Sequence, residues 1–113
     1  MEDRIAISLL KQGNLNGLEA LVNRYQAKAV RAAYLITHDR AMAEDVAQAA
    51  FVKAAERIQQ FDENRAFPPW FFRIVVNDAL KLARRMKRNV SLDDLDEEAS
   101  ALAALLADPA PQP

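Results

Sequence analysis

Aromatic and basic side chains gather in one stretch of the sequence, residues 61–88. Seven lysines and arginines lie in residues 65–88 against a single acidic residue, Asp78, so this segment has a net charge of +6. Aromatic rings stack on unpaired bases and cations neutralise phosphates, and surfaces that bind single-stranded nucleic acid combine the two. We therefore predict a nucleic-acid-binding surface in this stretch.

The net charge of the whole chain is only −1, which conceals an uneven distribution. Residues 1–64 carry eight basic and nine acidic residues, whereas residues 89–113 carry six acidic residues and no basic one. The local field governs binding more than the average does, so the chain average does not argue against a nucleic-acid ligand. Cations near a helix C-terminus also stabilise the helix dipole, but that effect accounts for one or two of them.

Several functional classes are excluded by composition. The 113 residues contain no cysteine and one histidine, His38, so disulfides, thiolate metal sites and a histidine metal centre are not expected. No nucleophile lies in a plausible catalytic arrangement and no glycine-rich phosphate loop occurs, so we expect no enzyme, no catalytic residue and no cofactor. No apolar run approaches the roughly 20 residues that cross a bilayer, so we expect a cytoplasmic protein without membrane insertion.

Apolar residues recur at helical spacing throughout, and both glycines occur before residue 18. We predict an all-α fold: a small bundle of four helices over residues 1–90, followed by an acidic, proline-ended linker over residues 91–113 that can hold a short helix near residues 92–106. The expected helices cover residues 3–12, 17–37 and 40–59, and a fourth runs from Pro69 or Trp70 to Arg88. Asn14 or Asn16 is expected to cap the second helix, and Asp39 the third.

The third predicted helix has two distinct sides. Its buried side should consist mostly of small residues, namely Ala43, Val46, Ala47, Ala50, Phe51, Ala54 and Ile58. The opposite, exposed side should carry Asp45, Gln48, Ala49, Val52 and Glu56. An apolar Val52 among polar groups is either ordinary surface or part of a surface that docks another protein.

The fourth predicted helix also divides into two arcs. The buried arc should contain Phe71, Phe72, Val75, Val76, Ala79, Leu82, Ala83 and Met86. The exposed arc should contain Trp70, Arg73, Ile74, Asn77, Lys81, Arg84 and Arg88. For Phe67 and Trp70 two interpretations stay open, because a small domain also needs aromatic rings to fill its core.

These patterns resemble region 2 of bacterial RNA polymerase sigma factors, specifically the extracytoplasmic-function (ECF) group. The resemblance covers about residues 5–90 and lies in an ordered set of motifs: the run AEDVAQAAFVKAAERIQQFD, then F-x-x-W-F-F-R-I-V-V-N over Phe67–Asn77, then a basic helix end. The segment SLDDLDEEA, followed by proline, is similar to the linker that leads towards region 4 in that family. The chain departs from the family at Ala49, where glutamate is frequent, and at Ala55, where tryptophan is common.

The resemblance implies a module that binds core RNA polymerase and recognises and melts the promoter minus-ten element. The exposed side of the third helix would dock on the clamp coiled coil of the largest polymerase subunit. A loop would capture a flipped base of the non-template strand, and the next helix would contact neighbouring bases and phosphates. The matching positions are Phe61, Asn64, Arg65 and Phe67 in the loop, then Trp70, Arg73, Asn77, Lys81, Arg84 and Arg88 on the helix.

The resemblance also implies a regulator of the anti-sigma type. Two alternatives therefore stay open at this point. One is a helical bundle that such a regulator binds and that has little DNA binding of its own. The other is a basic helical DNA binder without strand selectivity.

Overall fold

A computed structural model describes residues 1–87, 101 and 103 of the chain. Helices α1 (Asp3–Lys11), α2 (Leu15–Thr37), α3 (Arg40–Glu56) and α4 (Phe67–Lys87) follow one another, with a single 3-10 turn, η1 (Ile58–Gln60), after α3. This part of the chain contains no strand. The predicted all-α fold with four helices is confirmed.

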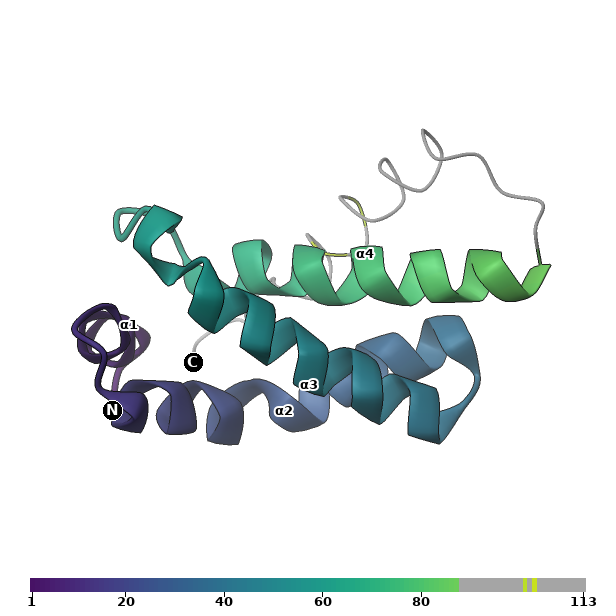
Figure 1. The fold of residues 1–113 in the computed structure, drawn as a ribbon, viewed down its shortest axis with the longest axis horizontal. Helices are drawn as coiled ribbons and strands as arrows, with labels where there is room; N and C mark the ends of the chain where they lie inside the picture. Colours follow the sequence, from purple (N-terminus) through teal and green to yellow (C-terminus); the bar gives the residue numbers. More distant parts are fainter. Residues whose placement is uncertain (88–100, 102, 104–113) are drawn as a thin grey trace, which may run out of the picture.

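The two long helices α2 and α4 extend along the length of the molecule, and α3 crosses obliquely over them (Figure 1). Helix α1 is seen almost end-on in this view, beside the start of α2. The loop between η1 and α4 lies at the same end of the molecule as α1. This end therefore brings the N-terminal helix close to the segment that precedes the basic helix.

The junctions between helices follow from a few polar residues. Asn14 caps α2, because its side chain accepts a hydrogen bond from the amide of Asn16 at 2.9 Å. His38 ends α2 in a left-handed conformation with φ of +58°, and the Asp39 side chain then accepts from the amide of Met42 at 3.0 Å. The predicted cap at Asp39 is confirmed. Helix α2 begins two residues earlier than expected, and α3 ends at Glu56 because η1 forms the next turn.

Helix α4 begins at Phe67, earlier than the predicted start at Pro69 or Trp70. The first four amides of an α-helix have no partner within the helix. Pro68 and Pro69 occupy the second and third helical positions, so their missing amide protons cost no hydrogen bond. Both prolines are therefore compatible with the first turn.

The core at the loop end of the bundle is aromatic. Phe67, Phe71 and Phe72 of α4 are fully buried, and the ring of Tyr25 lies with its centroid 5.6 to 6.3 Å from each of theirs. Phe51 of α3 stacks on Phe71 at 4.5 Å. Aromatic pairs in such arrangements stabilise a core beyond their apolar burial. These contacts join α2, α3 and α4 around one cluster of rings.

Every residue predicted on the buried side of α3 is buried. The predicted arcs of α4 need three corrections. Met86 is 60% exposed and Leu80 is buried, and Ile74, expected on the exposed arc, is partly buried against the core. Of the predicted linker, residues 91–113, only Ala101 and Ala103 are described; both are helical, and Ala103 packs against the core. The rest of that segment, including most of the helix expected near residues 92–106, lies outside the described residues.

Helix α1 is anchored to α2 at two places. The Asp3 carboxylate accepts hydrogen bonds from the Tyr25 hydroxyl and from Arg24 Nη1, the latter at 2.6 Å. Burial, reinforced by the hydrogen bond to Asp3, raises the pKa of the Tyr25 hydroxyl well above its ordinary value. At Gly17 the helices are so close that a Cβ atom would lie 2.1 Å from the carbonyl oxygen of Ala6.

Candidate nucleic-acid interface

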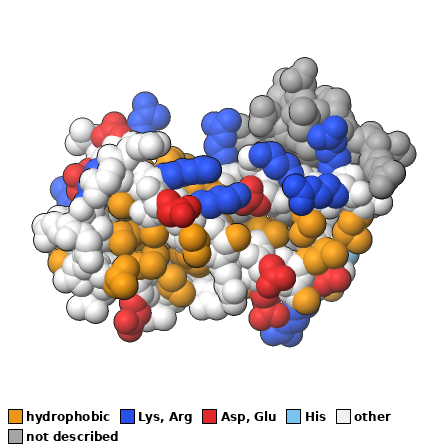
Figure 2. Space-filling view, viewed as in Figure 1, with side chains coloured by type: hydrophobic (Ala, Val, Ile, Leu, Met, Phe, Trp, Pro, Cys, Tyr) orange, Lys and Arg blue, Asp and Glu red, His pale blue; other side chains and the backbone are white. Residues whose placement is uncertain are grey.

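Helix α4 presents a basic face to solvent. Arg73 and Lys81 are exposed, and Asn77 and Arg84 are partly exposed. Figure 2 shows lysine and arginine side chains gathered along the edge of the molecule where α4 runs. None of the ion pairs among residues 1–87 uses Arg73, Lys81 or Arg84. Arg88, which was also predicted to contact DNA, lies outside the described residues.

A hollow of about 600 Å³ lies between the loop and the first turns of α4. Trp70 and Phe61 contribute aromatic surface to it, and Arg65 and Arg73 contribute positive charge. Other parts of its lining come from Gln60, Asp62, Ala66 and Pro69. The hollow therefore combines the two properties, stacking surface and cationic charge, that an unpaired nucleotide requires.

The rings of Phe61 and Phe67 are both buried, which for Phe67 agrees with the core interpretation that the sequence had left open. Phe61 and Phe67 are only 3% and 2% exposed. The centroids of these two rings lie 6.0 Å apart. The centroid of Trp70 lies 4.9 Å from that of Phe61 and 5.9 Å from that of Phe67, so the three rings form a cluster. Phe67 is thus a core residue, whereas Phe61 forms part of the wall of the hollow. Trp70 combines both roles, because it is partly buried and also lines the hollow.

The exposed tip of the loop carries Asn64 and Arg65, as predicted. Asp62 shapes this tip: its carboxylate accepts from the amide of Asn64 at 2.9 Å, and its carbonyl accepts from the amide of Arg65 at 3.0 Å. An aspartate that bonds the backbone two residues ahead is a common turn device. Asp62 was not among the predicted site residues, although the D-x-N spacing could have indicated this turn.

The face of α3 that was predicted to dock another protein is exposed. This face consists of Asp45, Gln48, Ala49, Val52 and Glu56. Val52 is 57% exposed, but Leu15 and Leu35 are more exposed still, so this value alone does not distinguish a docking surface from ordinary surface. The role of Val52 in docking stays a prediction.

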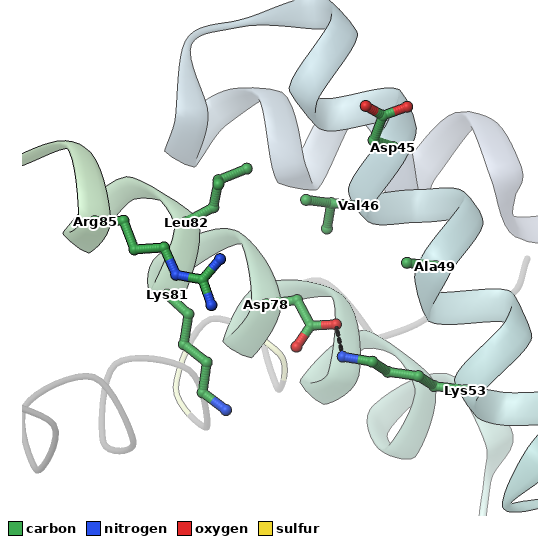
Figure 3. Close-up of a pocket in the computed structure, with 8 residues that line it drawn as sticks. All are labelled: Asp45, Val46, Ala49, Lys53, Asp78, Lys81, Leu82 and Arg85. Carbon is green, nitrogen blue, oxygen red and sulfur yellow. Dashed lines mark hydrogen bonds and ion pairs between the residues drawn. The ribbon is translucent and has the colours of Figure 1, made fainter.

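A groove of about 360 Å³ separates the α3 face from the basic face of α4 (Figure 3). Asp45 and Ala49 lie on the α3 wall, and Lys81 and Arg85 on the α4 wall. Lys53 Nζ donates to Asp78 Oδ2 at 2.6 Å across it. The two predicted binding faces therefore border on the same groove. Arg85 adds a cation to this groove, although it was not part of the predicted exposed arc of α4.

Residues 21–97 match the family model of sigma-70 region 2. The chain belongs to the sigma-70 region 2 family. The resemblance predicted from the sequence motifs is thereby confirmed, and the matched residues include α3, the loop and α4.

Individual sigma factors agree with the assignment to region 2. The chain is 33% identical over 87 residues to the ECF RNA polymerase sigma factor SigW of Bacillus subtilis, covering 77% of this chain and 46% of that protein. It is 32% identical over 99 residues to the RNA polymerase sigma-H factor of Pseudomonas aeruginosa, covering 87% of this chain and 51% of that protein. The chain thus spans about half the length of these curated relatives.

A solved structure of an engineered region 2 of sigmaE in complex with GTAAAA is similar to this region 2 domain. The TM-score is 0.71 and the identity 30%, and the match covers 81% of this chain and 96% of that one. The bundle described above is therefore the sigma region 2 fold.

Two further observations concern residues 1–87. No group of three or more histidine, aspartate or glutamate side chains is arranged there to hold a metal ion. Within the same part of the chain, every helix is too short or too polar to span a membrane.

Proposed function

We propose that this region 2 domain binds core RNA polymerase through the exposed face of α3 and recognises and melts the promoter minus-ten element through the loop and α4. The observation that carries the proposal is the hollow beside the loop, where Trp70 and two arginines line a space next to the basic face of α4. The similarity to a region 2 in complex with GTAAAA supports the same ligand class for this chain. The domain would act by binding, and we assign no catalytic residue.

Capture of one base explains how such a surface would melt duplex DNA. Extruding a base costs a few kcal/mol, and stacking on an aromatic ring returns roughly 1 to 3 kcal/mol. Trp70 and the Phe61 wall offer the stacking surface, and Arg65 and Arg73, which also line the hollow, would attract the phosphates of the opened strand. The hollow would therefore stabilise the opened strand relative to the duplex.

The rest of α4 would divide its contacts by chemistry. Asn77 can donate to and accept from one base edge, which allows it to read sequence. Lys81 and Arg84 supply the positive charge of this face, and we assign them to phosphates, whose contacts position the strand without reading its sequence. Asn64 at the exposed loop tip would contact the captured nucleotide.

The α3 face would supply the polymerase contact, on the clamp coiled coil of the largest subunit. Asp45, Gln48 and Glu56 lie on the same exposed side of α3 as Val52, so the face combines polar groups with an apolar side chain. Ala49 adds no carboxylate to this rim. We also propose that the domain acts in the cytoplasm and is controlled there by a regulator of the anti-sigma type.

Fluorescence anisotropy with labelled oligonucleotides tests the DNA half of this proposal. The domain should bind the single strand GTAAAA more tightly than a permuted strand of the same composition and more tightly than the corresponding duplex. Equal affinity for single strand and duplex would indicate a basic helix without strand selectivity. Binding to neither would indicate a protein-interaction bundle.

A further inference from the structure

Lys11, the last residue of α1, makes hydrogen bonds and an ion pair to the segment before α4. Its ammonium nitrogen donates to the carbonyl oxygen of Phe61 at 2.8 Å and lies 3.6 Å from Glu63 Oε2. Its own carbonyl oxygen accepts a hydrogen bond from Gln59 Nε2 at 2.7 Å. Lys11 therefore contacts Gln59 of η1 and two residues of the loop, Phe61 and Glu63.

These contacts do more than stabilise α1. A cation that served only the helix dipole would lie over the last carbonyls of its own helix. The Lys11 ammonium instead approaches a carbonyl 50 positions away in the sequence, and the lysine side chain is only 20% exposed. Withdrawing an ammonium from water costs free energy unless acceptors replace the lost solvent, and here Phe61 and Glu63 supply them.

Phe61 connects Lys11 to the hollow. The Phe61 ring is buried, and its centroid lies 4.9 Å from that of Trp70, which lines the hollow together with Arg73. A displacement of the Phe61 backbone would move its ring away from Trp70 and change the width of the hollow. The hydrogen bond from Lys11 fixes that backbone at the carbonyl.

Helix α1 is suited to hold Lys11 in place because α2 holds α1. Asp3 binds Arg24 and Tyr25 at one end of α1, and the close approach at Gly17 lets α1 lie directly on α2. Contacts with α2 thus fix the position of α1, and α1 in turn fixes the position of the loop through Lys11. None of these residues belongs to the basic face of α4.

We propose that Lys11 is a positioning residue for the hollow that accepts the flipped base. By holding the Phe61 carbonyl it keeps the aromatic wall in place before DNA arrives, so that binding does not have to order the loop. This inference rests on the proposed function and adds α1 to the elements that determine base capture.

The test compares Lys11→Met, which keeps the aliphatic stem, with Lys11→Arg, which keeps a cationic donor. The probe is GTAAAA, together with versions in which one nucleotide at a time is abasic. In the unaltered domain, loss of the captured base should lower affinity by about tenfold, as expected for loss of one stacking contact. Lys11→Met should reduce that penalty to about twofold to threefold, and Lys11→Arg should restore most of it. Arg31→Met, which removes an exposed cation of α2, should leave the penalty unchanged.

A second measurement does not depend on DNA. Hydrogen exchange at the amides of Asn64 and Arg65, which bond to Asp62, should be several-fold faster in Lys11→Met than in Lys11→Arg. If Lys11→Met prevents folding, Gln59→Leu removes only the hydrogen bond to the Lys11 carbonyl and should change both readouts in the same direction by less.

A full abasic penalty in folded Lys11→Met, with unchanged exchange, would overturn the role of Lys11. Absence of an abasic penalty at every position in the unaltered domain would instead overturn base capture itself, and the inference with it. The two failures are therefore distinguishable.

Discussion

The ammonium nitrogen of Lys53 on α3 lies 2.6 Å from a carboxylate oxygen of Asp78 on α4, and both side chains are partly shielded from solvent. This ion pair crosses the groove between the face proposed for polymerase and the face proposed for DNA (Figure 3). Its position suggests that it fixes the angle between the two faces. In this pair Lys53 also balances the charge of Asp78, the single acidic residue of residues 65–88, beside the face proposed for DNA.

A double-mutant cycle with Lys53→Met and Asp78→Asn should show a coupling free energy of roughly 1 kcal/mol, at the upper end for exposed pairs because this pair is partly buried. Urea unfolding of the four proteins gives this value. The exposed pair of Arg40 and Glu44, with 3.8 Å between its charged atoms, is the matched control and should show only a few tenths of a kcal/mol. Equal coupling free energies in both cycles would show that the Lys53–Asp78 pair stabilises the domain no more than an exposed pair does.

The fold was largely predictable because the chain has a clear helical period. The small residues of α3 repeat on one side, and that repeat alone indicated which side is buried. The Lys53–Asp78 pair was not predictable, because it depends on how α3 crosses α4. Residues 25 positions apart carry no local signal of contact.

The site was predictable only in part, for a related reason. Charged and amide side chains such as Asn64 and Arg73 are exposed as expected, because burying them would cost free energy. An aromatic ring is compatible with either a core or a base, so the sequence could not decide the places of Phe61 and Phe67. Lys11 was missed because its partner lies 50 residues away.

Gly17→Ala should destabilise the domain by roughly 1 to 3 kcal/mol, because the new Cβ would lie 2.1 Å from the Ala6 carbonyl oxygen and push α1 away from α2. Gly13→Ala is the matched control. Gly13 has a φ of +84° but open space around it, so the cost should be only about 1 kcal/mol of backbone strain. Thermal unfolding compares the two variants. A cost for Gly17→Ala no larger than that for Gly13→Ala would show that the helices can separate freely.

Tyr25 should make stability fall at alkaline pH. Its pKa is raised in the folded state by burial and by Asp3, so above about pH 10 the unfolded state releases a proton that the folded state keeps. The free energy of unfolding of the unaltered domain should therefore exceed that of Tyr25→Phe by a constant amount near neutral pH, and this difference should shrink from about pH 10 upward. Urea unfolding at several pH values measures it. A difference in free energy of unfolding that does not change with pH would contradict the raised pKa of Tyr25.

Asp45→Arg should abolish association with core RNA polymerase while leaving the helical content unchanged. Asp45 is exposed on α3, so reversing its charge disturbs a binding face without disturbing the core. Glu19→Arg, an equal charge reversal at an exposed position of α2, is the control and should bind as before. Co-purification with core enzyme and circular dichroism give the two readouts. Retained binding by Asp45→Arg would remove the α3 face from the proposal.

Replacing Lys81 and Arg84 together by methionine should flatten the salt dependence of single-strand binding. Each phosphate contact releases condensed counterions, so the slope of log affinity against log salt should fall by about 0.7 per lost contact, or about 1.4 for the pair. The preference for GTAAAA over a permuted strand should persist, because contacts to phosphates carry no sequence information. Arg40→Met is the charge control, because Arg40 is the first residue of α3, pairs with Glu44 and does not belong to the basic face of α4. A slope that stays the same in the double variant would show that the basic face of α4 does not contact phosphate, whereas a lost preference would show that it reads sequence.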